Sequence, residues 1–197
     1  MSWPAPFTLR GGIATLEPLR TDHHDGLVAA VMDGELWNLW YTKVPTPQTM
    51  TADIERRLAL QARGSMLPLV VIANDTGRIV GATSYMNIDA ENRRVEIGST
   101  WYAASVQRSG LNTECKRLLL AHAFEALDCI AVEFRTSFFN RQSRRAIERL
   151  GAKLDGILRS HMIVANGTLR DTCVYSIIAG EWPAVRANLE WLARTIR

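Results

Sequence analysis

The chain has 197 residues, of which 47% are hydrophobic and 22% charged, a composition typical of a soluble globular protein with a sizeable core. Its formal net charge of +3 is small, and Lys and Arg form no continuous run. This charge favours a small anionic ligand and argues against a nucleic-acid partner. No apolar run approaches the roughly 20 residues that span a bilayer, and residues 1–6 lack the basic and apolar regions of a secretory signal. We therefore expect a cytoplasmic protein without a membrane partner.

Cysteine and histidine give no sign of a metal site. Cys115, Cys129 and Cys173 are odd in number and lack CxxC spacing, which argues against a disulfide framework or a zinc site and for a reducing compartment. The four histidines show no ligand spacing with one another or with cysteine. His122 lies among leucines in a predicted helix, where we expect it to pack. We expect no bound metal.

The first third of the chain predicts a strand and two helices. Thr21, and later Thr49 or Thr51, offer side-chain oxygens that can cap a helix N-terminus. In chain order we expect a strand (13–19), a helix (21–32) and, after an aromatic segment and two prolines, a second helix (51–63).

The middle of the chain predicts three strands in quick succession, over 67–73, 78–88 and 95–102. Turn residues 74–77 separate the first two, and polar residues 89–93 separate the second from the third. Strands this close in sequence pair as an antiparallel meander.

Helices and strands alternate in the last part of the chain. Gly151 is placed to end a helix, Asn166-Gly167 is a strong hairpin signal, and Pro183 suits the start of a terminal helix. The predicted elements are a helix (112–127), a strand (130–136), a helix (142–150), two strands (153–164 and 169–178) and a C-terminal helix (180–197).

This element order predicts an α+β fold. We expect a central mixed, mostly antiparallel sheet flanked by helices, with one parallel crossover and a C-terminal hairpin. No repeat, low-complexity tract or linker divides the chain. We therefore expect a single domain over 1–197, with an N-terminal extension (1–12).

A polar loop precedes the predicted helix at 112 and is a candidate phosphate site. The first N–H groups of a helix lack intrahelical partners and carry positive potential. Gly110 allows close approach of a ligand to the backbone, and Arg108 adds a cation, so the loop can seat a phosphate. The alternative is an ordinary helix capped by Asn112. Neither a GK[ST] nor a GxGxxG motif is present.

Two motifs resemble those of the GNAT superfamily of acetyl-CoA-dependent N-acetyltransferases. Residues 107–112, QRSGLN, resemble the family's Q/R-x-x-G-x-G/A loop, with Asn112 where Gly or Ala is usual. Residues 140–143, NRQS, followed by Leu150-Gly151-Ala152, resemble its N-x-x-S/A…L-G-F/A segment. Together with VEIGSTWY at 95–102, they look most like the RimJ/RimL-type branch.

The resemblance implies a GNAT fold and transfer of acetyl from acetyl-CoA to a primary amine. It implies that the pantetheine arm runs beside the backbone of Thr100, Trp101 and Tyr102 and contacts Asn140, although Asn140 also reads as a turn residue. It assigns the pyrophosphate of coenzyme A to the loop residues, which are Gln107, Arg108, Ser109, Gly110, Leu111, Asn112 and Thr113. Arg141, Arg144 and Arg145 either face the 3′-phosphate or form a solvated helix face.

Glu96 is the candidate general base, because an ammonium group cannot attack until it loses a proton. The alternative is an exposed carboxylate paired with Arg93 or Arg94. Many members of the family carry a tyrosine general acid where this chain has Ile147. Ser143 either takes that role or caps the helix that follows it.

The acceptor site is predicted from Trp37, Trp40 and Tyr41, which fall where the family's first helices cover the substrate; core or dimer contacts are the alternative. Arg170 and Asp171 either touch the acceptor or form a cross-strand pair. We expect a small-molecule amine or a protein or peptide N-terminus as acceptor, and a homodimer is possible. A non-catalytic acyl-CoA-binding sensor or interaction module is the alternative function.

Overall fold

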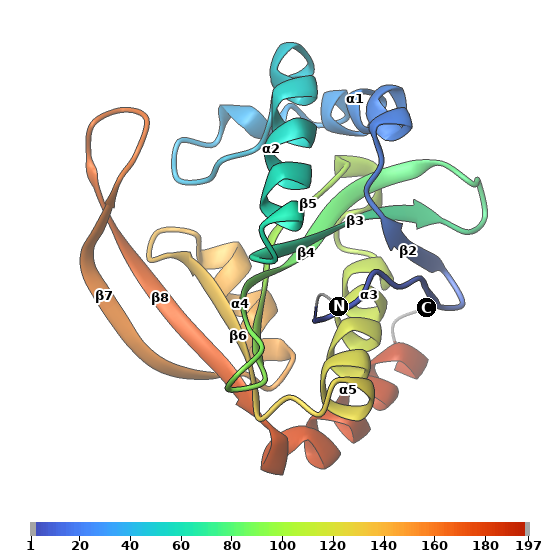
Figure 1. The fold of residues 1–197 in the computed structure, drawn as a ribbon, viewed down its shortest axis with the longest axis vertical. Helices are drawn as coiled ribbons and strands as arrows, with labels where there is room; N and C mark the ends of the chain where they lie inside the picture. Colours follow the sequence, from blue (N-terminus) through green and yellow to red (C-terminus); the bar gives the residue numbers. More distant parts are fainter. Residues whose placement is uncertain (1–2, 196–197) are drawn as a thin grey trace.

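A computed structural model describes residues 3–195 (Figure 1). The ends of the predicted N-terminal extension and C-terminal helix, residues 1–2 and 196–197, lie outside the described residues. In chain order the elements are β1 (Leu9–Arg10), β2 (Ala14–Pro18), α1 (His24–Met32), α2 (Met50–Ala62), β3 (Met66–Ala73), β4 (Ile79–Asp89), β5 (Arg94–Tyr102), α3 (Leu111–Ala121), β6 (Ala131–Ser137), α4 (Arg141–Arg149), β7 (Lys153–Ile163), β8 (Leu169–Ile178) and α5 (Trp182–Thr195).

The strands form one sheet in the order β1-β2-β3-β4-β5-β6-β8-β7. Strands β5 and β6 are parallel, and every other neighbouring pair is antiparallel. The predicted fold class, the meander, the single parallel crossover and the C-terminal hairpin are therefore confirmed. The sequence did not predict β1, because two residues are too few to show a strand period.

Strands β5 and β6 pair only near their first residues. Arg94, Val95 and Glu96 lie opposite Ala131, Val132 and Glu133, and the parallel pairing ends there. Both strands continue, β5 beside β4 and β6 beside β8, and Figure 1 shows them diverging. We call residues 97–102 and 134–137 the splayed segments. Each has one edge whose peptide groups face no neighbouring strand.

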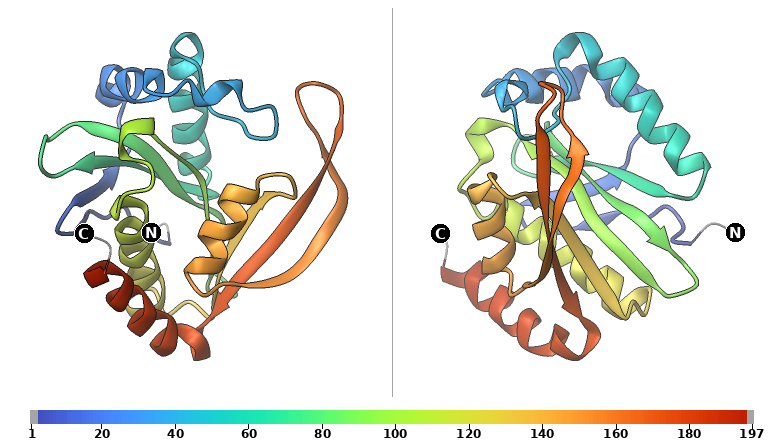
Figure 2. Two further views of the ribbon diagram at one scale, coloured as in Figure 1. Left: turned by 180° about the vertical axis from the view of Figure 1, so that it is seen from behind. Right: turned by 90° about the vertical axis from the view of Figure 1, so that its left-hand side faces the viewer.

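The helices cover the sheet in two groups. Apolar residues of α3, α4 and α5 share a core with one face of the sheet: Leu119, Ile147 and Leu189 belong to the same buried cluster as Phe134. Helices α1 and α2 form a second core on the other face, mainly over β3 and β4. Figure 2 shows the β7–β8 hairpin standing apart from α1 and α2. The two faces of the splayed segments therefore belong to different helix groups.

Helix starts differ from the predicted caps. Thr21 begins a short 3₁₀ turn and α1 starts only at His24, with no side-chain cap. The buried His23 side chain accepts the N–H of Arg20 at 3.2 Å. At α2 the N-cap residue is Thr49, one of the two predicted positions, but its side chain accepts no helix N–H. Thr46 accepts the N–H of Thr49 in the preceding 3₁₀ turn. Helix α3 continues as a π-helical turn, His122–Ala126. Gly151 has φ 102°, as expected for a residue that ends a helix.

Candidate active site

A bulge in β5 opens the splayed segments. The register between β4 and β5 shifts at this point, and Ser99 has a left-handed φ of 52°. Arg57, buried on α2, donates to the Ser84 hydroxyl at 3.2 Å and to the Ser99 carbonyl at 3.5 Å. Burial lowers the pKa of Arg57, and Asp53 at 2.6 Å opposes that effect. Helix α2 thus holds the bulge through a paired, buried cation.

Glu96 lies where the two strands part, on the same face as Arg57. Its side chain accepts a hydrogen bond from Asn87 at 2.6 Å and lies 3.5 Å from Arg135 Nε. The residue is only 6% exposed, and burial raises the pKa of its carboxyl, although Asn87 and Arg135 oppose the shift. A Cβ at Gly98 would stand 2.8 Å from Glu96 Oε1, so glycine there leaves room for the carboxylate.

The alternative reading of Glu96 as an exposed strand carboxylate is wrong. Arg93 pairs with Asp128, and Arg94 pairs with Glu133. Both arginines therefore have other carboxylate partners, and Glu96 itself is buried.

Free amides gather at the N-terminus of α3. In the described part of the chain, no acceptor takes the N–H groups of Arg108, Ser109, Gly110, Asn112 and Thr113, whereas Leu111 N–H donates to Ser109 Oγ at 3.2 Å. The prediction that Asn112 caps the helix is wrong: the helix begins one residue earlier, at Leu111, and has no side-chain cap. Such a row of unpaired N–H groups suits an anion.

The loop before α3 is tied to the end of β5. Gln107 Nε2 donates to the carbonyl of Tyr102 at 2.9 Å. Arg108 is exposed and has a left-handed φ of 60°, which turns the chain into the helix. At the other side, Arg149 of α4 donates to the buried Thr113 hydroxyl at 2.8 Å, so only the backbone of Thr113 is available to a ligand.

The backbone of residues 100–102 forms the free edge nearest this loop, while the side chains turn inward. Trp101 is buried against α1 and α2, and Tyr102 against α3. The Thr100 hydroxyl accepts a hydrogen bond at 2.9 Å from Lys116, a buried lysine of α3. Only backbone groups of Trp101 and Tyr102 can therefore meet a ligand here.

At the start of α4, Asn140 takes the cap role that was one of the two expected for Ser143. Asn140 Oδ1 accepts the N–H of Ser143 at 3.0 Å, so Asn140 is the N-cap. The reading of Ser143 as a cap is wrong, because its amide is the donor. Ile147 is buried in the core.

The arginines of α4 divide into two kinds. Arg144 donates to the Tyr175 hydroxyl at 3.0 Å and lies over the Phe138 ring, which gives it a structural role. Arg141 and Arg145 are exposed. Only the latter two remain candidates for the 3′-phosphate of a nucleotide ligand.

The predicted aromatic residues lie between α1 and α2. Trp37 packs against the α1–α2 core, whereas Trp40 is 51% exposed and contacts Tyr41. The Trp40 ring also lies 5.6 Å from the ring of Phe139, which precedes α4. The connection between α1 and α2 therefore reaches the beginning of α4, near the open ends of the splayed segments.

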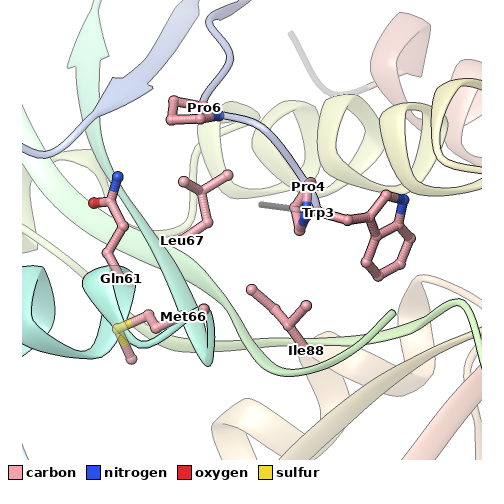
Figure 3. Close-up of a pocket in the computed structure, with 8 residues that line it drawn as sticks. Trp3, Pro4, Pro6, Gln61, Met66, Leu67 and Ile88 are labelled. Atoms are coloured by element: carbon pink, nitrogen blue, oxygen red, sulfur yellow. The ribbon is translucent and has the colours of Figure 1, made fainter. Parts of the chain in front are cut away.

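A small cavity lies elsewhere, between the N-terminal segment and β3 (Figure 3). Its volume is about 20 Å³, enough for one water molecule and too little for a substrate. Trp3, Gln61 and Ile88 are among the residues that line it.

The described residues contain no group of His, Cys, Asp and Glu suited to a metal, and none of their helices is long and apolar enough to cross a membrane. His122 packs against Phe7, with ring centroids 3.9 Å apart, which agrees with its predicted packing role.

Sequence reasoning missed four charged or polar residues of this region: Arg57, Asn87, Lys116 and Arg135. Arg57 and Lys116 left a signal, because each continues the apolar stripe of its helix where a hydrophobic residue is expected. Asn87 and Arg135 left none. They meet Glu96 only through strand pairing between distant segments.

Comparisons with known proteins point to one family. A profile described as "Acetyltransferase (GNAT) domain" matches residues 14–153. "Putative ribosomal N-acetyltransferase YdaF" of Bacillus subtilis (strain 168) is 35% identical over 106 residues, 54% of this chain and 57% of that protein, so the match spans less than two thirds of the relative's length.

Solved structures share the fold over nearly the whole chain. A GCN5-related N-acetyltransferase from Brucella melitensis is 31% identical with a TM-score of 0.83, covering 96% of this chain and 86% of that one. Mycobacterium smegmatis RimJ, solved in complex with CoA-disulfide, is 23% identical with a TM-score of 0.79, covering 98% of this chain and 96% of that one. The chain therefore belongs to the GNAT acetyltransferase family.

Proposed function

We propose that the protein moves the acetyl group of acetyl-CoA to the primary amine of a peptide or protein N-terminus. The observation that carries this proposal is the row of unpaired N–H groups at the start of α3. It lies beside the free edge of β5, the strand that also carries the buried carboxylate of Glu96. The relative named as a ribosomal N-acetyltransferase favours a protein acceptor over a small molecule.

The residues present fit coenzyme A. The free amides of residues 108–110, Asn112 and Thr113 would hold the pyrophosphate, and exposed Arg108 adds positive charge. The free edge of residues 100–102 would take the amides of the pantetheine arm as it would take another strand. Asn140 keeps its side-chain N–H₂ for the same arm, because only its oxygen is used in the helix cap.

Glu96 acts as the general base. Acetyl-CoA supplies an activated thioester, so no covalent enzyme intermediate is required. The pKa of the Glu96 carboxyl is raised by burial, which makes its carboxylate a better acceptor for the ammonium proton. A backbone N–H of the free edge of β5 donates to the developing oxyanion. Ser143, whose hydroxyl makes no hydrogen bond among the described residues, donates a proton to the departing thiolate.

Donor binding and turnover test the proposal separately. We expect calorimetric titration to show binding of acetyl-CoA, and thiol release to show turnover with peptides that have a free N-terminus. Glu96→Gln should lower kcat by about 10²–10⁴-fold while donor binding persists. Glu91→Gln, in the exposed β4–β5 turn, is the matched control and should keep the rate.

Two other outcomes would change the assignment. No binding at millimolar acetyl-CoA would overturn the proposal. Binding without turnover of any amine would favour a non-catalytic acyl-CoA sensor, an alternative that Ile147 at the usual position of the tyrosine general acid keeps open.

A further inference from the structure

Two arginines share the face of the sheet that carries Glu96. Residues opposite each other in paired strands project to the same face, and side chains alternate along each strand. Glu96 lies opposite Glu133, and Ser137 lies opposite Thr172. Along β6, Arg135 lies two residues from both Glu133 and Ser137, so all three project to the face of Glu96. Along β8, Arg170 lies two residues from Thr172 and projects to that face as well.

The arginines of this face are incompletely paired. Glu133 binds both Arg94 and Arg135, the latter at 3.0 Å. The side chain of Arg170 makes no hydrogen bond or salt bridge to any described residue, and its Nε is buried without a hydrogen-bond acceptor. Arg135 Nε is also buried; it lies 3.5 Å from Glu96 Oε2 but makes no hydrogen bond. A buried donor without an acceptor is unfavourable, so the Arg170 guanidinium in particular lacks an anionic partner.

The carboxylate next to Arg170 in the sequence does not pair with its guanidinium. Asp171, which follows Arg170, binds Arg159 at 2.6 Å and the N–H of Ser160 at 2.7 Å. On the shared face, Glu133 binds Arg94 and Arg135, and Glu96 lies 3.5 Å from Arg135. Asp155 accepts a hydrogen bond from the Ser176 hydroxyl at 3.0 Å. None of these carboxylates makes a salt bridge to Arg170, which lies beside the proposed general base.

We propose that Arg135 and Arg170 bind a carboxylate of the acceptor, close in sequence to the amine that Glu96 deprotonates. The proposal rests on the proposed function and names its substrate class: an amine that carries a carboxylate within one or two residues. The source is either the α-carboxylate of a free amino acid or an acidic side chain next to a peptide N-terminus.

Geometry supports this position and this residue type. Arg135 Nε lies 3.5 Å from Glu96 Oε2, so a carboxylate on Arg135 stands beside an ammonium group held by Glu96. Arg135 is 33% exposed on its side chain, which leaves part of the guanidinium reachable. Guanidinium groups bind carboxylates in a planar, two-point geometry that lysine cannot reproduce.

Isosteric acid and amide acceptors test the site. The first arm compares the peptides Ala-Asp-Ala-amide and Ala-Asn-Ala-amide, and the second compares alanine with alaninamide. In at least one arm we expect kcat/KM to favour the acid by tenfold or more, and that arm identifies the source of the carboxylate. Arg170→Gln and Arg135→Gln should each bring the acid-to-amide ratio towards one. Arg78→Gln, at an exposed arginine just before β4, should leave the ratio unchanged.

The ratio separates carboxylate binding from a general effect on Glu96. If the arginines only keep Glu96 ionised, both rates fall by the same factor and the ratio stays, which overturns the proposal. Equal rates for acid and amide in both arms also overturn it. Thermal melting and acetyl-CoA titration show whether each variant is folded with an intact donor site.

A binding measurement covers an enzyme that turns over none of these acceptors. The protein–coenzyme A complex is titrated with the N-acetylated products of the same pairs. Tighter binding of the acid, lost in Arg170→Gln, supports the site, and equal binding overturns it. Failure of the wild type to bind acetyl-CoA would overturn the proposed function instead, so the two failures are distinguishable.

Discussion

At the scale of single residues, Lys116 is the most unusual group near the proposed donor site. It is 7% exposed and donates to the Thr100 and Thr83 hydroxyls at 2.9 and 3.5 Å, with no carboxylate partner among the described residues. The pKa of the neighbouring Cys115 thiol is raised to about 12, so it stays neutral and supplies no counter-ion. Burial lowers the pKa of Lys116 to about 8.

Lys116→Met should therefore stabilise the protein at pH 7. Below pH 8 the native state carries a buried charge that the unfolded chain exposes to water. Between pH 8 and the ordinary lysine value of 10.5, the unfolded chain holds a proton that the native state has released, so native stability rises with pH. Replacing the ammonium by an apolar side chain of similar length should raise the free energy of unfolding at pH 7 by up to ~3 kcal/mol and remove that rise.

Urea unfolding of both proteins at pH 7 and pH 9.5 checks this prediction. The Thr83 and Thr100 hydroxyls, 2.7 Å apart, still bond to each other in the variant. Lys43→Met, on an exposed side chain, is the control for loss of one positive charge. A loss of stability in Lys116→Met at pH 7 would mean that the threonine hydrogen bonds outweigh the burial of the charge.

At the scale of elements, strands and helices were easier to predict from the sequence than their ends. Alternating β-branched residues between turn signals placed β3, β4 and β5 within one or two residues. Helix starts were wrong because no side chain caps them: α1 follows a 3₁₀ turn that begins at Thr21, and α3 begins at Leu111 without a side-chain cap. A cap depends on which oxygen reaches the amide in three dimensions, and residue type alone does not decide that.

The start of α3 gives a prediction at this scale, because a proline there removes a backbone N–H that no described acceptor takes. Asn112→Pro removes one of the free N–H groups, and proline is tolerated in the first turn of a helix. A hydrogen bond to a charged group contributes about 1.5–3 kcal/mol, so the Kd for acetyl-CoA should rise roughly 10- to 100-fold. Calorimetric titration measures the Kd.

Asn112→Ala is the matched control, since it keeps the N–H and removes only the side chain. It should bind acetyl-CoA nearly as tightly as the wild type. Equal affinity of the proline and alanine variants, with both folded by thermal melting, would show that this amide does not hold the phosphate.

At the scale of the whole molecule, the site joins segments that no local pattern connects. Glu96 and Glu133 are brought together by the single parallel pair, and Arg170 reaches the same face from the C-terminal hairpin. The motifs around residues 107–112 and 140–143 were visible in the sequence because each occupies one loop. The neighbours of Glu96 were not, because strand register sets them.

The contact of Trp40 with Phe139 also links distant segments, since it joins the α1–α2 connection to the start of α4 across the open ends of β5 and β6 (Figure 2). Trp40 is half exposed, so Trp40→Ala should change the melting temperature little. An aromatic pair contributes about 0.5–1.5 kcal/mol. If the contact keeps the α1–α2 connection over the acceptor, KM for a peptide acceptor should rise about 2- to 12-fold in Trp40→Ala.

Steady-state kinetics at saturating acetyl-CoA give KM. Trp191→Ala, on α5 and 61% exposed, is the control and should leave KM unchanged. An unchanged KM in Trp40→Ala would limit the contact to a structural role, and the acceptor would then have to be bound by the sheet face alone.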